Sequence, residues 1–160
     1  DATGLYTPVT GAENAFPGKV LESVTWNAIF TDFANAFTSL ARYSEIAFVF
    51  DGGGTALPAG LGGYIEVPFA CTITRVTLLA DVAGSCVVDV WKDTYANYPP
   101  TVADSITAAA KPTLAAAIKY QDSVLTGWTV AVASGSILAF NLDSSSIITK
   151  LTVSLLMART

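Results

Sequence analysis

Residues 147–157 read Ile-Ile-Thr-Lys-Leu-Thr-Val-Ser-Leu-Leu-Met and alternate between two kinds of side chain. Every second position from Ile147 to Met157 is apolar or threonine, whereas Lys150, Thr152 and Ser154 fall between them. A period of two is typical of a β-strand with one face in the core and the other in solvent. This stretch therefore predicts a strand with Ile147, Thr149 and Leu151 on its inner face.

The same period of two extends back to residue 45. Further strands are predicted at 46–50, 64–69, 72–81, 86–92, 115–120, 123–132 and 138–142, with turns at 51–54, 59–60, 83–84, 134–135 and 143–146. Short strands with close-set turns predict an all-β domain over residues 45–160, an antiparallel β-sandwich of jelly-roll type. Pro68 predicts an edge strand, because proline cannot donate a ladder hydrogen bond.

Residues 25–43 follow a helical period instead. Apolar side chains recur there at i, i+3, i+4 and i+7, which predicts one amphipathic helix. Thr25 or Ser23 can cap its first turn. The apolar stripe consists of Trp26, Ile29, Phe30, Phe33, Phe37 and Leu40.

The chain ahead of the helix reads as an extended arm. Glycine and proline are frequent in residues 1–24, and apolar side chains such as Tyr6 and Phe16 are spaced along this segment. We therefore divide the chain into an arm and helix, 1–44, and a β-domain, 45–160. The arm's apolar side chains and the helical stripe are the candidate attachment or oligomer interface. The stripe could pack on the chain's own β-domain, on symmetry mates or on a larger particle.

The composition is unusually apolar. Apolar residues make up 52% of the chain and charged residues 13%, and the net charge is −5. No apolar run reaches the roughly 18 residues that a spanning helix needs, so we expect no membrane insertion. Lys and Arg are scattered singly, which argues against nucleic-acid binding. An obligate interface is the simplest place to bury the apolar excess.

The residues offer little catalytic chemistry. The chain has no histidine, which removes the usual triads, dyads and the commonest metal ligand. Asp89 and Asp93 flank Trp91 and could form a two-carboxylate or sugar site, but we interpret them as a solvated strand end. Cys71 and Cys86 are too few for a disulfide framework, and we expect reduced thiols, with Cys86 buried. We expect no enzyme activity, no cofactor and no metal site.

A long connection at 95–112 interrupts the strand pattern. It begins with Tyr95 and Tyr98 beside two prolines, and long loops in compact domains are often functional. We expect these two tyrosines to be exposed and name them as candidate ligand contacts. Trp91 and Trp128 could also stack on a sugar, but their surroundings favour buried positions.

Two stretches resemble structural proteins of tailed bacteriophages. Residues 6–18 running into 25–32 resemble the segment by which fibre-type proteins attach to a particle. Residues 63–73, 87–100 and 125–128 are similar to a β-domain of tail-fibre and head-fibre proteins. The resemblance implies a β-sandwich, homotrimers, a place in the virion and no enzymatic activity. The chain departs from long fibres because no shaft separates the helix from the β-domain.

Two functions follow as hypotheses. The first is a short homotrimeric fibre or spike, or a capsid-decorating protein, attached to capsid or tail proteins through residues 1–44. The second is a carbohydrate- or receptor-binding module of a phage adhesin, with a host-surface glycan as ligand.

Overall fold

The computed structural model describes residues 23–40 and 42–160, with helix side chains from Trp26 to Phe37. The chain forms two compact units, residues 1–40 and 41–160. The first contains helix α1 (Ser23–Leu40), so the predicted helix is confirmed, starting two residues earlier and ending three residues earlier than expected. The predicted arm falls almost entirely in 1–22, outside the described residues, as do the side chains of both candidate caps.

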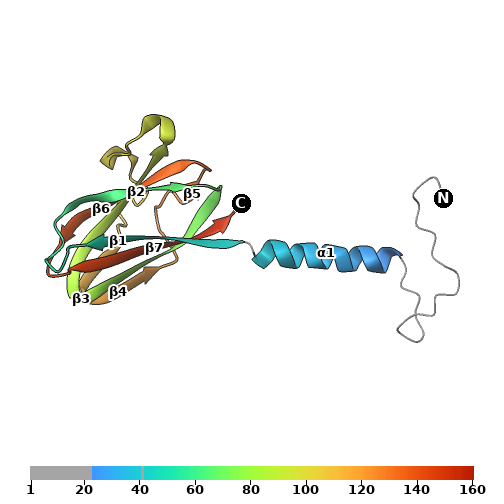
Figure 1. The fold of residues 1–160 in the computed structure, drawn as a ribbon, viewed down its shortest axis with the longest axis horizontal. Helices are drawn as coiled ribbons and strands as arrows, with labels where there is room; N and C mark the ends of the chain where they lie inside the picture. The colour runs from blue at the N-terminus through green and yellow to red at the C-terminus, as the bar shows by residue number, and fades with distance from the viewer. Residues whose placement is uncertain (1–22, 41) are drawn as a thin grey trace. The chain divides into compact units, whose positions relative to one another are not determined.

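The second unit is built from antiparallel strands, which confirms the all-β expectation (Figure 1). Within the described residues, seven strands join into one curled sheet with the order β1-β7-β3-β6-β2, and β4 and β5 also pair with β3. The strands are β1 (Tyr43–Asp51), β2 (Gly60–Val67), β3 (Cys71–Thr94), β4 (Thr113–Asp122), β5 (Ala131–Val132), β6 (Ser136–Ser145) and β7 (Lys150–Arg159).

Strand β3 is the centre of the unit, and it corrects one prediction. It runs unbroken through residues 83–84, where the sequence predicted a turn between two strands. Its first part pairs with β7 and its second part with β6. Gly84 marks close packing there, because a Cβ would lie 2.6 Å from a side-chain carbon of Ile148. The missing side chain makes room for a neighbour instead of allowing a turn.

Strand β1 approaches β2 and β6 through side chains that meet in the core. The rings of Phe48 and Phe140 stack with their centroids 5.0 Å apart. A Cβ on Gly62 would lie 2.3 Å from the Phe50 ring, so only glycine lets β2 approach this closely. The inner face of β7 supplies four fully buried side chains to the same core: Leu151, Val153, Leu155 and Met157.

The start of β7 differs from the prediction. Ile148 is fully buried and Ile147 is 64% exposed, so the expected inner face is wrong before residue 150. Two backbone amides, of Thr149 and Lys150, donate to the Asp81 carboxylate and turn the chain into the strand. Alternation therefore holds only once the ladder with β3 has begun.

Two further segments were tested by the structure. The predicted strand at 123–132 is mostly a loop, because Asp122 accepts from the amide of Val124 and Gly127 has a φ of +78°. Only β5 at its end pairs with β3. Strand β2 lies at one end of the strand order, as Pro68 predicted, although the strand ends one residue before the proline.

Candidate functional site

The outer face of β2 carries the most suggestive surface of the β-unit. Ile65 and Val67 point toward the core, so alternation turns Tyr64 and Glu66 outward. Tyr64 lies opposite Ala139 of β6, and Glu66 lies opposite Ile137.

The chain that follows β3 brings two more tyrosines to this face. A single 3-10 turn, η1 (Tyr95–Asn97), begins directly after the strand and leads into Tyr98. The rings of Tyr98 and Tyr64 meet edge to face, with centroids 4.9 Å apart. Tyr95 is 80% exposed and Tyr98 51%, so the expected exposure of both candidate ligand contacts is confirmed.

These side chains border one hollow of about 390 Å³, lined by Tyr64, Glu66, Tyr95, Tyr98 and Ile137. Burial of the Tyr64 ring raises the pKa of its hydroxyl, and the neighbouring Tyr98 raises it further. The Tyr64 phenol is therefore neutral at physiological pH, and Glu66 is the one acidic or basic residue in the lining. We call this group of five residues the tyrosine site.

Tyr64 and Glu66 were not identified from the sequence. The signal was available, because residues 64–69 were predicted as a strand with Ile65 and Val67 inward, which leaves 64 and 66 on the outer face. What the sequence did not give was the path of residues 95–98 back across that face.

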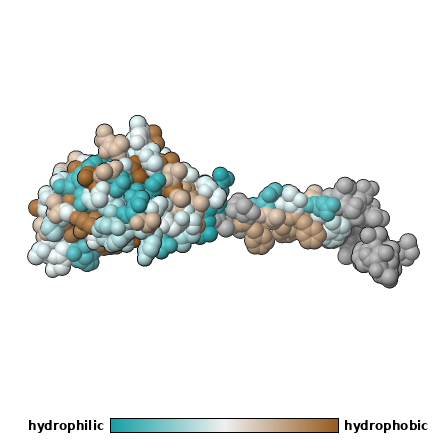
Figure 2. Space-filling model, turned by 90° about the horizontal axis from the view of Figure 1, so that it is seen from above, coloured by the Kyte–Doolittle hydropathy of each residue, from teal (hydrophilic) through white to brown (hydrophobic). Residues whose placement is uncertain are grey.

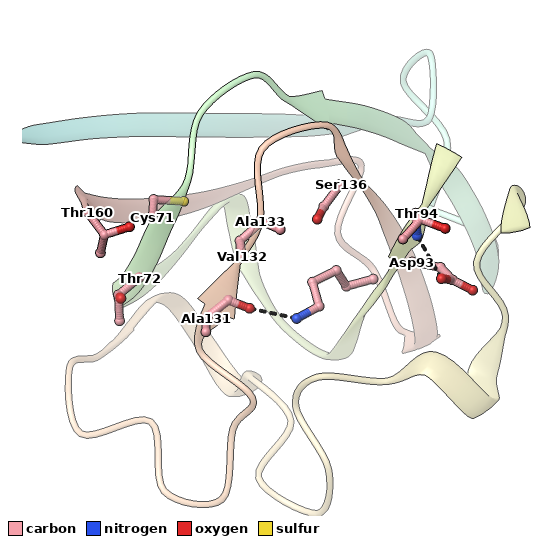
Figure 3. A pocket seen from close by; sticks show the side chains of 10 residues that line it. Cys71, Thr72, Asp93, Thr94, Ala131, Val132, Ala133, Ser136 and Thr160 are labelled. Atoms are coloured by element: carbon pink, nitrogen blue, oxygen red, sulfur yellow. Dashed lines mark hydrogen bonds between the residues drawn. The ribbon is translucent and has the colours of Figure 1, made fainter. Parts of the chain in front are cut away.

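A larger hollow lies on another part of the unit. Its volume is about 490 Å³ and its lining includes Cys71, Lys92 and Thr160 (Figure 3). Lys92 Nζ donates to the carbonyl of Ala131 at 2.6 Å, so one of its N–H groups is already bound within the protein. Burial raises the pKa of the Cys71 thiol, which disfavours the reactive thiolate. Neither Lys92 nor Cys71 therefore gives this hollow a reactive group.

Asp89 has a structural role that the sequence did not predict. The side chain is fully buried, so its interpretation as part of a solvated strand end is wrong. It accepts from the hydroxyls of Ser105 at 2.7 Å and Thr107 at 2.6 Å, and it pairs with Lys111 at 2.9 Å. Burial acts to raise the pKa of Asp89, but hydrogen bonds from Thr107, Ser105 and Lys111 outweigh it and the pKa is lowered.

This network fastens residues 101–112 to β3, so Asp89 is unavailable to a ligand. The other two candidate aromatic side chains, Trp128 and Trp91, are buried or half-buried in the β-unit. Trp128 is 9% exposed and its Nε1 donates to the carbonyl of Ala110 at 2.9 Å. Trp91 is half-buried on β3, beside Asp89. Cys86 is buried and Cys71 likewise, both as free thiols, which agrees with the expectation from sequence.

The helical part of the predicted attachment surface lies on α1, where apolar side chains gather along one side of the helix (Figure 2). Phe30, Phe33 and Phe37 are 65%, 58% and 70% exposed, and Trp26 is 48% exposed. Ile29 is half-buried. The Trp26 and Phe30 rings contact one another with centroids 6.2 Å apart, one helical turn along the same face. Tyr6, Phe16 and the Leu40 side chain lie outside the described residues.

The described part of the chain offers neither a metal site nor a membrane-spanning helix. Within residues 23–40 and 42–160, no cluster of three acidic, cysteine or histidine side chains could hold a metal ion. In the same ranges, no helix combines the length and hydropathy of a membrane span. No protein-family model matches the chain, and no curated protein matches it either.

Proposed function

We propose that the protein is a structural component of a tailed-bacteriophage virion, either a short homotrimeric fibre or spike, or a head-decorating protein. Residues 1–44 attach it to capsid or tail proteins. Residues 45–160 form the projecting domain, whose finer architecture in this proposal is a β-sandwich of jelly-roll type. The observation that carries the proposal is the exposed apolar stripe of α1.

The exposure of that stripe supports attachment for an energetic reason. Burying one large apolar side chain is worth about 1.5–3 kcal/mol, so four exposed aromatic rings on one helix face favour a partner. The low charge content and the resemblance of residues 6–18 and 25–32 to phage attachment segments support the same conclusion.

The direct test is gold labelling of the chain on particles of the phage that encodes it, viewed by electron microscopy. Label over the head would favour decoration, and label on the tail would favour a fibre or spike. Absence of label from all particles would overturn the virion proposal.

The role of the stripe is tested by substitution. We expect the triple change Phe30→Ala, Phe33→Ala and Phe37→Ala to abolish incorporation into particles. The matched control, Asp32→Ala with Asn35→Ala, changes the polar side and leaves incorporation intact. Alanine favours helix at every one of these positions, so helix loss cannot explain a difference. Equal incorporation of both variants would exclude the stripe as the anchor.

The homotrimer is tested by the mass of the purified chain in solution. Sedimentation equilibrium should give three times the protomer mass of 16.6 kDa. A monomer at all concentrations would exclude the homotrimer.

A second function, receptor binding by a phage adhesin, is favoured by the tyrosine site. Aromatic side chains that stay exposed beside a hollow are typical of surfaces that bind a partner. This function is compatible with the first, because a fibre can carry both an anchor and a receptor site.

A further inference from the structure

The tyrosine site combines two kinds of surface that one ligand can use together. Tyr64, Tyr95 and Tyr98 present aromatic carbon next to phenolic hydroxyls, and Glu66 presents a carboxylate at the same hollow. Ile137 of β6, which is 6% exposed, adds apolar surface to the lining. A pyranose ring has matching properties, because C–H groups cover its faces and hydroxyls surround its edge.

The charge of the lining restricts the ligand further. Glu66 contributes a negative charge, and neither lysine nor arginine lines the hollow. An anionic sugar would meet this carboxylate with no cation to offset the repulsion. A neutral sugar can instead donate a hydroxyl to Glu66 in a charge-assisted hydrogen bond.

The hollow is held in shape before any ligand binds. Asp93 Oδ1 accepts from the amide of Thr94 at 2.7 Å and from Asn97 Nδ2 at 3.1 Å, which fixes the turn between Tyr95 and Tyr98. The edge-to-face contact of Tyr98 with Tyr64 fastens the end of this turn to β2. A site that is already ordered loses less entropy on binding.

We propose that the tyrosine site binds one uncharged pyranose unit, stacked on tyrosine and hydrogen-bonded through Glu66. The inference deepens the proposed receptor-binding function and rests on it only for the source of the sugar, a glycan on a cell surface.

The test is a titration of the full-length purified chain, followed by NMR. The probes are the methyl glycosides of glucose, galactose and N-acetylglucosamine, with N-acetylneuraminic acid as the anionic comparison and tetramethylammonium as the cationic one. A ligand of this size predicts a dissociation constant on the order of 1 mM for at least one neutral glycoside. The neutral glycoside should shift the signals of residues 64–66 and 95–98, and the acid should not.

Variants separate the site from the rest of the surface. Tyr98→Ala should weaken binding at least about 10-fold, since stacking and the support of Tyr64 are both lost. Tyr43→Ala is the control, because Tyr43 is a 59% exposed tyrosine on β1 outside the lining, and it should leave affinity unchanged. Glu66→Gln should keep most neutral-sugar binding and admit N-acetylneuraminic acid, because the amide still bonds hydroxyls without repelling a carboxylate.

Different results would overturn the saccharide inference and the virion proposal. If no neutral glycoside shifts residues 64–66 and 95–98 at roughly 50 mM, well above the expected constant, the saccharide inference is overturned. Binding of tetramethylammonium alone would overturn it too, in favour of a cation site. Neither result bears on the virion proposal, which gold labelling tests independently. Unlabelled particles with intact sugar binding would leave the tyrosine site standing by itself.

Discussion

Helix α1 and strand β7 carry comparable apolar patterns but differ in how those side chains are covered. Leu151, Val153 and Leu155 of β7 are fully buried, whereas Phe30 and Phe33 of α1 are 65% and 58% exposed. The strand belongs to a sheet that curls around its own core. The helix belongs to a separate unit, residues 1–40, and a single helix cannot enclose its own apolar side. Periodicity thus identifies the element and its apolar face, but not what covers that face.

The largest effect is expected where the two halves of the sheet meet. Phe140→Ala removes a fully buried ring that stacks on Phe48, and we expect a loss of about 3–5 kcal/mol in the free energy of unfolding. Urea denaturation followed by circular dichroism measures the change. A loss below about 1 kcal/mol would show that this contact does not close the core.

The buried carboxylate should come next. Asp89→Asn leaves Lys111 short of one partner and weakens two hydroxyl bonds, and we expect a loss of about 2–4 kcal/mol at pH 7. Asp93→Asn on the same strand is the control. Among residues 23–40 and 42–160, Asp93 forms no ion pair, and an amide oxygen can still accept from Thr94, so the loss should stay below about 1 kcal/mol. Similar losses for both variants would contradict the central role of Asp89.

The same carboxylate predicts a dependence of stability on pH. The pKa of Asp89 is lower in the folded protein than the value near 4 of an unfolded chain. Its contribution is therefore complete above about pH 5 and is lost as pH falls through the folded pKa. Unfolding free energies from pH 7 to pH 3 should fall more steeply for the natural chain than for Asp89→Asn. Parallel curves would remove Asp89 from the explanation.

A smaller effect is expected at the approach of β2 to β1. Gly62→Ala places a methyl group 2.3 Å from the Phe50 ring and 2.7 Å from the Phe48 ring, so these rings must move. We expect a loss of about 1–3 kcal/mol. Leu61→Ala, at a 44% exposed neighbour, should cost less than about 1 kcal/mol in the same urea titration. A larger loss for Leu61→Ala than for Gly62→Ala would show that β2 does not need a glycine to approach the rings of β1.

The smallest effect on the stability of the β-unit is expected from the apolar stripe of α1. Phe33→Ala on α1 should change the unfolding free energy of the β-unit by less than about 0.5 kcal/mol, although it removes the same side chain as Phe140→Ala. The measurement is again urea denaturation of the full chain. A loss of several kcal/mol would mean that the stripe is covered in solution, and would redirect the attachment proposal.

Much of the fold could be predicted from local patterns. The helix, the all-β class and strands β1 and β6 follow from periods of 3.6 and 2, because the apolar face of each element is set within a few residues. The error at 83–84 has a physical reason, since Gly84 is required by the distant Ile148 side chain and not by a turn. The error at 123–132 came from an apolar run in which Leu125 and Gly127 adopt positive φ values.

The sites were harder to predict, because their residues meet only in the folded sheet. Tyr95 and Tyr98 were found through the adjacent prolines, but their neighbour Tyr64 precedes them by more than 30 residues. Asp89 is joined by groups 16 and 18 residues later in the chain. No local spacing reveals either set, because strand pairing brings both together.

The pairing of β3 has a consequence for the order of synthesis. Its first part lies against β7, which also pairs with β1, and its second part lies against β6. On the ribosome, β1 and β3 are therefore complete while β7, the strand that joins them, has not yet been translated. Strand β6 can pair with β2 and with the second part of β3 before β7 is made, but β1 and the first part of β3 are joined only after residues 150–159 emerge, and such distant pairings fold slowly. Until then the first part of β3 lacks its partner strand β7, and its apolar side chains are open to aggregation. Rapid pairing once β7 emerges would limit that exposure.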